Sequence, residues 1–269
     1  KLDLGRTIVP FGNLMAVTEE EVEYKDFEGQ SQNYQGTVTL STDPFGFSTT
    51  LSLVQNTYEI VSGQPKVVLS RTRSTQKARD GSGAVTVSLV QTGYTDGTED
   101  PSGLAAEYHK NHPEGKVWKG LIEEVKDQQV VFDNPLTGAS EAYIGAVTVA
   151  HDAFGFTTSV SKANNRYDLV YGISRVGETR TTTENLSLDG AHSSTLSTVK
   201  YEYTVRESAD RNGDGTVSEA ELAELLPGVD PASRAAYVDP SGKLYPTLLK
   251  TAAGVSTSVS VDGFGFNTT

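Results

Sequence analysis

Alternation of apolar and polar residues is the main hydrophobic pattern of this chain. It runs through 36–42 (GTVTLST), 49–54 (TTLSLV), 84–90 (AVTVSLV), 145–150 (GAVTVA) and 197–205 (STVKYEYTV). A period of two predicts β-strands with one face toward a core. Val, Thr, Tyr and Phe dominate these runs, as a half-buried pleated surface prefers. Clusters of Gly, Asn and Asp separate them, so we expect short antiparallel strands joined by turns.

Helical periodicity is limited to short segments. The segment from Ser218 to Leu226 (SEAELAELL) predicts a helix, which Pro227 and Gly228 end. A weaker helical pattern surrounds Leu104.

An internal repeat organises the chain. DPFGFSTT, DAFGFTTS and DGFGFNTT begin at Asp43, Asp152 and Asp262, and the first two are 109 residues apart (152 − 43 = 109). Further matches at this offset pair Tyr34 with Tyr143, Gly36 with Gly145, Asn56 with Asn165, Tyr58 with Tyr167, Arg71 with Arg180 and Asp80 with Asp189. Such a period predicts tandem structural units.

We expect a first β-sandwich repeat over residues 1–114, a second over 115–241 and a partial third over 242–269. The fold class predicted is mainly β, with tandem antiparallel β-sandwich domains of the immunoglobulin-like kind. A short helix interrupts the second repeat.

Composition narrows the function classes. The formal net charge is −13 and the chain has 269 residues without cysteine. This charge argues against a nucleic-acid partner, whose phosphates it would repel. No apolar run approaches the 18 residues of a membrane-spanning helix, so we expect no membrane insertion. The sequence starts at Lys1 without a signal pattern, so we expect a removed signal or an excised part of a longer protein.

The segment DRNGDGTVSEAE, from Asp210 to Glu221, has the spacing of a calcium-binding loop. Its expected ligands stand at positions 1, 3, 5, 7, 9 and 12: Asp210, Asn212, Asp214, Thr216 through its backbone carbonyl, Ser218, often through water, and Glu221 with both oxygens. Gly215 at position 6 permits the sharp turn, and Val217 supplies an apolar residue under the loop. We therefore expect one Ca²⁺ per chain.

These twelve residues resemble the EF-hand calcium loop, and the resemblance covers only the loop and the helix after it. The entering side alternates like a strand rather than a helix. This is similar to the strand–loop–helix calcium loops of extracellular bacterial proteins. The first unit has Asp96 at the place of Asp214 but lacks the other ligands, so no ion is expected there. Because the site occurs in one unit and not in its counterpart, we expect the ion to stabilise the structure locally. The resemblance implies an extracellular or cell-surface location.

The repeated Phe-Gly-Phe turns allow two interpretations. Asp before each turn can bond its own backbone, and the Gly permits a positive φ. The favoured interpretation makes Phe45, Phe47, Phe154 and Phe156 core residues, because aromatic side chains at strand spacing usually pack inward. The alternative makes them a binding surface.

We find no catalytic constellation and predict that the protein is not an enzyme. His109 and His112 could share a metal on a helix, but no third ligand stands nearby, and an exposed loop is the simpler interpretation. The motifs of serine hydrolases, zinc proteases and phosphate-binding loops do not occur.

The terminal strand, 254–266, leaves three possibilities open. It pairs within the chain, it completes a neighbouring molecule by strand exchange, or it reflects where the sequence was cut. The function expected is a structural, calcium-stabilised subunit or segment of an extracellular repeat protein, such as a filament, sheath, surface layer or adhesin. The alternatives are a ligand- or carbohydrate-binding β-sandwich module with a structural calcium and a hydrolase with an unrecognised site.

Overall fold

The computed structural model describes residues 5–8, 14–61, 63–95, 120–170, 173–205 and 207–268. The strands are β1 (Gly5–Ile8), β2 (Leu14–Thr18), β3 (Glu21–Lys25), β4 (Ser31–Gln35), β5 (Thr37–Thr42), β6 (Ser48–Val61), β7 (Gln64–Ala78), β8 (Gly83–Tyr94), β9 (Ile122–Asp127), β10 (Gln129–Asn134), β11 (Ala139–Ile144), β12 (Ala146–His151), β13 (Thr157–Val170), β14 (Ile173–Ser187), β15 (His192–Tyr203), β16 (Leu249–Val261) and β17 (Asn267–Thr268). The helices are α2 (Glu219–Leu225), α3 (Pro231–Arg234) and the 3-10 turn η1 (Ala235–Tyr237). The weaker helical pattern near Leu104 and both candidate histidines, His109 and His112, lie outside the described residues.

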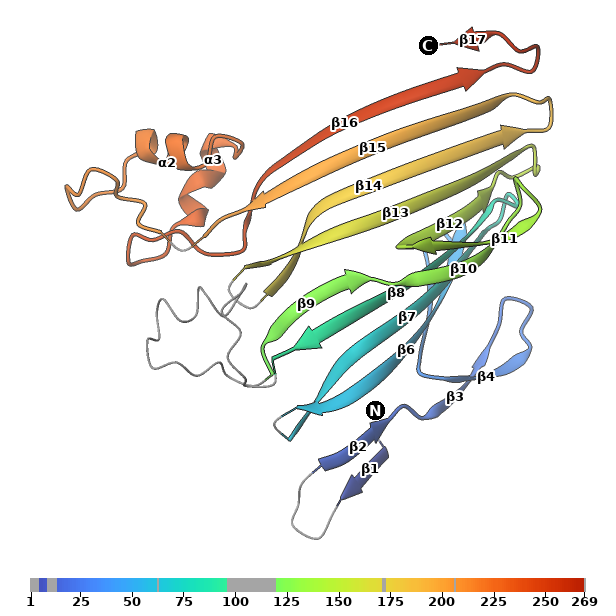
Figure 1. Cartoon of the computed structure of the whole chain (residues 1–269), viewed down its shortest axis with the longest axis horizontal. Helices are drawn as coiled ribbons and strands as arrows, with labels where there is room; N and C mark the ends of the chain where they lie inside the picture. The colour runs from blue at the N-terminus through green and yellow to red at the C-terminus, as the bar shows by residue number, and fades with distance from the viewer. Residues whose placement is uncertain are drawn as a thin grey trace.

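The predicted mainly β, antiparallel fold is confirmed. Over the described part of the chain, eleven strands form one sheet in the order β17-β16-β15-β14-β13-β12-β8-β7-β6-β5, with β9 beside β8 and β13. Figure 1 shows this sheet as a twisted array, with the helices at one end of β15 and β16. The pairs β1–β2, β3–β4 and β10–β11 form separate two-stranded sheets.

The 109-residue repeat reappears strand for strand. Strands β5, β6, β7 and β8 begin at residues 37, 48, 64 and 83, and β12, β13, β14 and β15 begin at 146, 157, 173 and 192 with the same lengths. The irregularity in the β6–β7 register falls between Thr57 and Tyr58, and its counterpart in β13–β14 falls between Arg166 and Tyr167. The sequence repeat is therefore accompanied by the same strand bounds and the same place of the register shift.

The two repeats share the sheet. Strand β8, the last of the first repeat, pairs with β12 of the second from Val87↔Val147 to Gly83↔His151. Strand β15 pairs in the same way with β16, from His192↔Val261 to Tyr203↔Leu249. The terminal strand therefore pairs within the chain, and each repeat joins the next through strand hydrogen bonds.

A hairpin lies over the β8–β12 joint and buries a core there. Val130 and Phe132 on β10 are 9% and 8% exposed, and they form one cluster with Val147 and Val160 of the sheet, which are 0% and 1% exposed. Half-buried side chains of Val87, Leu89, Leu136, Tyr143 and Val149 pack around this cluster. The core thus combines residues of both repeats.

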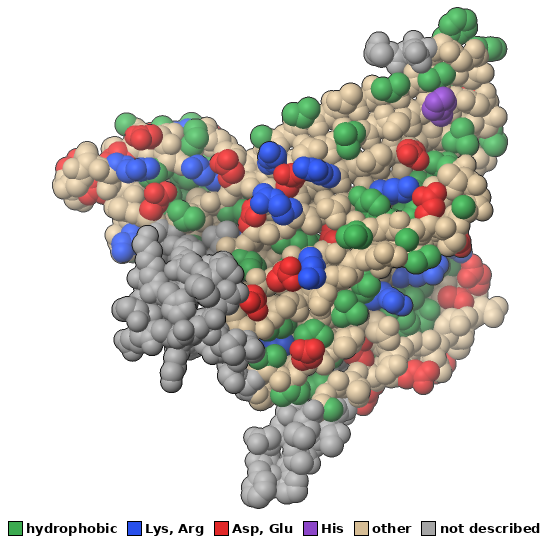
Figure 2. Space-filling view, viewed as in Figure 1, with side chains coloured by type: hydrophobic (Ala, Val, Ile, Leu, Met, Phe, Trp, Pro, Cys, Tyr) green, Lys and Arg blue, Asp and Glu red, His purple; other side chains and the backbone are tan. Residues whose placement is uncertain are grey.

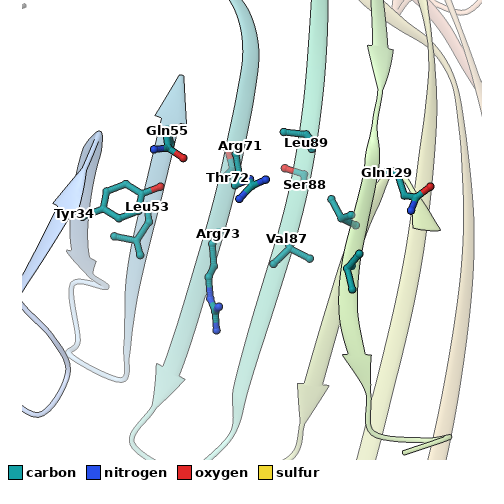
Figure 3. Close-up of a pocket in the computed structure, with 12 residues that line it drawn as sticks. Tyr34, Leu53, Gln55, Arg71, Thr72, Arg73, Val87, Ser88, Leu89 and Gln129 are labelled. Atoms are coloured by element: carbon teal, nitrogen blue, oxygen red, sulfur yellow. The ribbon is translucent and has the colours of Figure 1, made fainter. Parts of the chain in front are cut away.

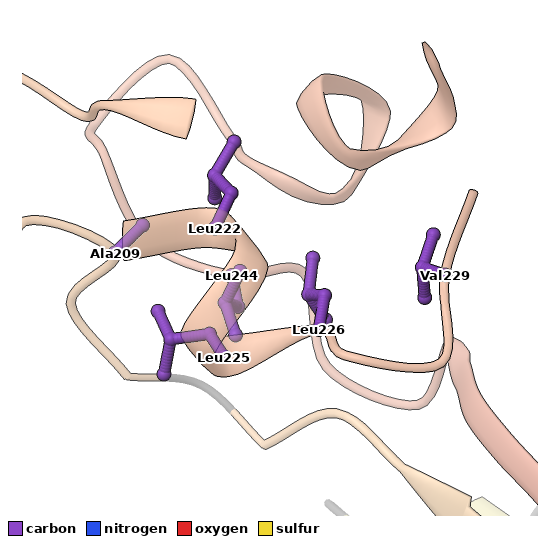
Figure 4. Packing of buried hydrophobic residues seen from close by; sticks show 6 residues of the cluster. All are labelled: Ala209, Leu222, Leu225, Leu226, Val229 and Leu244. Carbon is purple, nitrogen blue, oxygen red and sulfur yellow. The ribbon is translucent and has the colours of Figure 1, made fainter. Parts of the chain in front are cut away.

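The second core belongs to the helical segment between β15 and β16. It consists of Ala209, Leu222, Leu225, Leu226, Val229 and Leu244, shown together in Figure 4. Helix α2 begins after Ser218. The Ser218 side chain accepts a bond from the backbone N–H of Glu221, and the Glu221 carboxylate accepts one from the backbone N–H of Ser218. This reciprocal cap satisfies two amide groups at the start of the helix. The helix predicted after the acidic loop is confirmed.

The interpretation of the Phe-Gly-Phe residues as core is wrong. The side chains of Phe45, Phe47, Phe154 and Phe156 are 82%, 67%, 92% and 46% exposed. The reason is that they belong to turns beyond the strand ends, where Gly46 (φ +68°) and Gly155 (φ +64°) interrupt the alternation of a strand. The period of two therefore gives no information about which way these side chains face.

Candidate functional site

The acidic loop lies in the segment that connects β15 to β16, directly before α2. Gly213 and Gly215 adopt positive φ angles of 75° and 85°, a conformation that favours glycine. Gly215 thus makes the sharp turn expected from the sequence. Val217 packs against the cluster around Leu222, also as expected.

The carboxylate of Asp210 organises the first half of the loop. Its oxygens accept bonds from the backbone N–H groups of Gly213 (2.6 Å) and Gly215 (2.9 Å). Asp214 accepts bonds from the backbone (2.8 Å) and hydroxyl (2.7 Å) of Thr216, and the hydroxyl bond is the main reason that its pKa is lowered. The loop is therefore closed around oxygen atoms.

Glu221 closes the loop from the helix side. One carboxylate oxygen accepts backbone bonds from Arg211 (2.9 Å) and Asn212 (3.1 Å), and the other accepts bonds from the Ser218 backbone (2.9 Å) and hydroxyl (2.7 Å). These bonds, led by the Ser218 backbone bond, lower the pKa of Glu221 to about 2. The carboxylate is buried and charged at neutral pH, with its position set from both ends of the loop.

The predicted ligands form a donor set that suits a hard cation. Carboxylate, amide and hydroxyl oxygens are what Ca²⁺ prefers, and a carboxylate has about four lone-pair sites. Asp210 accepts two hydrogen bonds and Asp214 accepts three, so each has a site left, whereas Glu221 accepts four and would exchange some of them for an ion. Asn212 lies beside these groups: its side-chain oxygen accepts a bond from the backbone N–H of Asp214, and its side-chain NH₂ donates to the Asp214 carboxylate. No group of three acidic or histidine side chains already arranged for a metal occurs in the described residues. The loop residues therefore offer the donor chemistry and the turn of a calcium loop, without three acidic side chains arranged around one point.

The Phe-Gly-Phe turns form a second candidate site. Asp43 accepts bonds from the backbones of Phe45 (2.9 Å), Phe47 (3.2 Å) and Ser48 and from the Ser48 hydroxyl (2.9 Å). These bonds, above all the Ser48 backbone bond, lower the pKa of Asp43 to about 2. Asp152 and Asp262 make corresponding bonds in their own turns.

Each of the first two aromatic turns contacts the next hairpin turn, β7–β8 or β14–β15, at the same end of the sheet. The Arg79 backbone donates to Phe47 (2.8 Å), and the Leu188 backbone donates to Phe156 (2.9 Å). The third turn adds Phe264 and Phe266, which are 89% and 70% exposed. Figure 2 shows hydrophobic side chains reaching the surface at this end. Folding explains the repeated Asp and Gly, but it does not explain the repeated exposed Phe side chains.

A groove of about 420 Å³ lies over β6, β7 and β8, between the hairpins β3–β4 and β10–β11. Figure 3 shows Arg71 and Arg73 on its floor and Tyr34 on the β4 side. Neither guanidinium forms an ion pair with a carboxylate in the described part of the chain. The sequence indicated Arg71 only as a repeat match, because a groove between two hairpins depends on tertiary packing.

Among the described helices, none has both the length and the apolar character needed to cross a bilayer. Comparisons with protein-family models, with curated proteins and with solved structures found no match.

Proposed function

We propose that this protein is a structural, calcium-stabilised subunit or segment of an extracellular repeat protein, of the filament, sheath, surface-layer or adhesin kind. The observation that carries the proposal is the edge-to-edge joining of repeats, in which β8 pairs with β12 and β15 pairs with β16. When each repeat pairs edge to edge with the next, many strand hydrogen bonds hold neighbouring repeats together. Such a sheet resists the separation of its repeats. No catalytic role is assigned to any residue.

Calcium has a local role in this proposal. The acidic loop lies on the only covalent connection between β15 and β16, and it rests on the core around Leu222. An ion held by Asp210, Asp214 and Glu221 would fix this connection and the helix that follows. Such a role suits the extracellular space, where calcium is abundant enough for a loop of modest affinity.

The exposed Phe turns fit the adhesin or assembly form of the proposal. Each turn exposes two Phe side chains close together, and grouped apolar side chains on a surface mark interaction sites more often than single ones do. The three turns stand at one end of the sheet, so several can engage the same apolar partner together.

A melt with and without calcium, followed by negative-stain microscopy, tests the proposal. We expect calcium to raise the melting temperature of the wild type and ordered assemblies or extended particles to be visible. A chain that is indifferent to calcium and disperses as isolated compact particles at all concentrations contradicts it.

The groove between the hairpins supports a second candidate function, a ligand-binding module. Arg71 and Arg73 would attract an anionic ligand such as an acidic carbohydrate, and Tyr34 offers an aromatic face. Titration with uronic-acid and neutral oligosaccharides of equal length tests this candidate. Binding of the acidic series that Arg73→Ala weakens supports it, and equal or absent binding of both series rejects it.

A further inference from the structure

The two outer ends of the sheet are complementary halves of the joint that the molecule contains in its middle. In that joint, β8 of one repeat meets β9, β12 and the covering hairpin β10–β11 of the next. At the C-terminal end of the sheet, called the far end, β15 is the counterpart of β8. At the N-terminal end, called the near end, β2, β5 and the hairpin β3–β4 are the counterparts of β9, β12 and β10–β11.

The pairing registers establish these equivalences. Val22 faces Tyr34 in β3–β4, as Val130 faces Tyr143 in β10–β11. Strand β2 pairs with β1 and β9 pairs with β8, each with one register shift at the same place, next to Ile8 and Tyr94. Strand β2 therefore already pairs with a short strand, β1, at the place where β9 pairs with the end of β8.

Strand β16 is a reduced version of the element that normally covers such an edge. Along β15 it runs as one uninterrupted strand, from Tyr203↔Leu249 to His192↔Val261, with a single register shift between Glu202 and Tyr203. Along β8 the same path is divided between β9 and β12, and the chain leaves it after Asp127 to form the hairpin. Strand β16 thus fills the edge of β15 but carries no hairpin to cover the face.

Apolar side chains that are covered at the central joint are exposed at the two ends of the sheet. Leu196 on β15 is 54% exposed, whereas its counterpart Val87 packs against the central core. Val22 is 40% exposed, and its counterpart Val130 is 9% exposed. Leu40 is 54% exposed, and its counterpart Val149 packs against the same core.

We propose that a second copy of this chain docks its near end, β2, β5 and the β3–β4 hairpin, onto β15 in the register of the central joint, with release of β16. The register places Leu196 opposite Val38, as Val87 stands opposite Val147. The hydrogen bonds that β15 makes with its own β16 are replaced by bonds with β5 of the incoming copy. In the incoming copy, β1 leaves β2, and the end of β15 pairs with β2 in its place. The gain is the burial of Leu196 under Val22 of the incoming hairpin.

Each copy keeps one free end of each kind, so this contact is head-to-tail and does not close into a dimer. The inference rests on the proposed structural function and specifies its partner as another copy. It also gives the segment between β15 and β16 a purpose, because a tether of this kind allows β16 to leave without breaking the chain.

Disulfide trapping tests the register, since the chain has no cysteine of its own. Residues directly opposite in an antiparallel pair have Cα atoms about 4.5–5.5 Å apart, within the range of a disulfide. Oxidised Leu196→Cys/Val38→Cys chains should form a ladder of linked multimers. The matched control Thr195→Cys/Val38→Cys, whose first cysteine faces the other side of the sheet, should form at least tenfold less.

A second variant tests the release of β16. Ser194 and Val259 are opposite in β15–β16, so Ser194→Cys/Val259→Cys locks this strand in place. Sedimentation should show association with concentration for the wild type and for the reduced lock variant, and monomer only for the oxidised lock variant.

The proposal is overturned by a wild type that stays monomeric without a disulfide ladder, by equal ladders in both trapping variants, or by association that survives the lock. Failure here with a calcium-dependent melt intact removes only this inference. A chain that forms the ladder but ignores calcium removes only the calcium part of the proposed function.

Discussion

Asp127 accepts a 2.9 Å hydrogen bond from the hydroxyl of Tyr167, at the point where the covering hairpin leaves the sheet. It also accepts a 2.7 Å bond from the backbone of Asn165. In the first repeat, Glu19 receives the equivalent bond from Tyr58 (3.3 Å). Burial, followed by the charge of Asp127, raises the pKa of Tyr167 to about 12. A carboxylate thus fastens each hairpin to the irregular point of the long strand behind it.

Removal of this carboxylate should destabilise the hairpin. In Asp127→Ala, the half-buried Tyr167 hydroxyl and Asn165 amide lose their acceptor, and each unsatisfied group costs up to about 1–3 kcal/mol. Urea unfolding should show a decrease in this range for the variant. The matched control is Asp133→Ala on the exposed side of the same hairpin, which should change stability by less than about 0.5 kcal/mol.

Calcium should stabilise the wild type and should have little effect on a variant that lacks a loop carboxylate. We expect one site with a Kd on the order of 10⁻⁵ to 10⁻³ M, and about 1.4 kcal/mol of stabilisation at tenfold excess over Kd. Glu221→Ala should lose most of this gain, measured as the difference between melts with and without calcium. Glu224→Ala, an exposed carboxylate on the same helix, should keep it. Calorimetry that detects no calcium heat, or two equal sites, contradicts the assignment.

Acid should weaken the loop through Glu221. Its folded pKa of about 2 lies below its ordinary value of 4.5, so the unfolded chain binds the proton more readily between these values. The contribution of Glu221 is therefore present above about pH 4.5 and is lost as the pH falls toward 2. Without calcium, Glu221→Gln should flatten the stability profile in this window. An unchanged slope would mean that the carboxylate is not held as the structure shows.

The aromatic turns should be dispensable for folding. Phe154→Ala should change stability by less than about 0.5 kcal/mol, because its side chain is already in solvent. Phe132→Ala, the same substitution at a buried position, should cost about 3–5 kcal/mol. Thermal melts of the two variants separate a surface role from a core role. Binding of a hydrophobic dye that falls in Phe154→Ala alone would identify the turns as an apolar surface.

Strand positions could be predicted from the sequence because alternation is a local property. Strands β5–β8 and β12–β15 also keep the offset of 109 residues in their bounds, since the same side-chain pattern supports the same strands. The single shared sheet could not be predicted. The choice between separate sandwiches and a joined sheet depends on whether β8 pairs with β12, and such contacts between repeats leave no local pattern.

The acidic loop differs from the sheet, because its structure depends on residues close together in the sequence. Asp210, Asp214 and Glu221 are positioned by bonds to nearby backbone groups, so short-range spacing indicates the turn of the loop. Their role as calcium ligands stays a prediction. Phe45 and Phe47 were misassigned because the period of two was applied across a turn. The groove with Arg71 and Arg73 depends on two hairpins distant in sequence, and no pattern in either hairpin indicates it.

Comparison of β16 with β9 and β12 identifies a position where the sheet tolerates large changes in chain length. The path beside β15 is continuous at Gly254, whereas the path beside β8 is interrupted between Asp127 and Ala146, and both neighbours keep their register. A foreign domain inserted after Gly254 should therefore leave the ladder intact. Protein engineers can therefore use this position to display a cargo on β16.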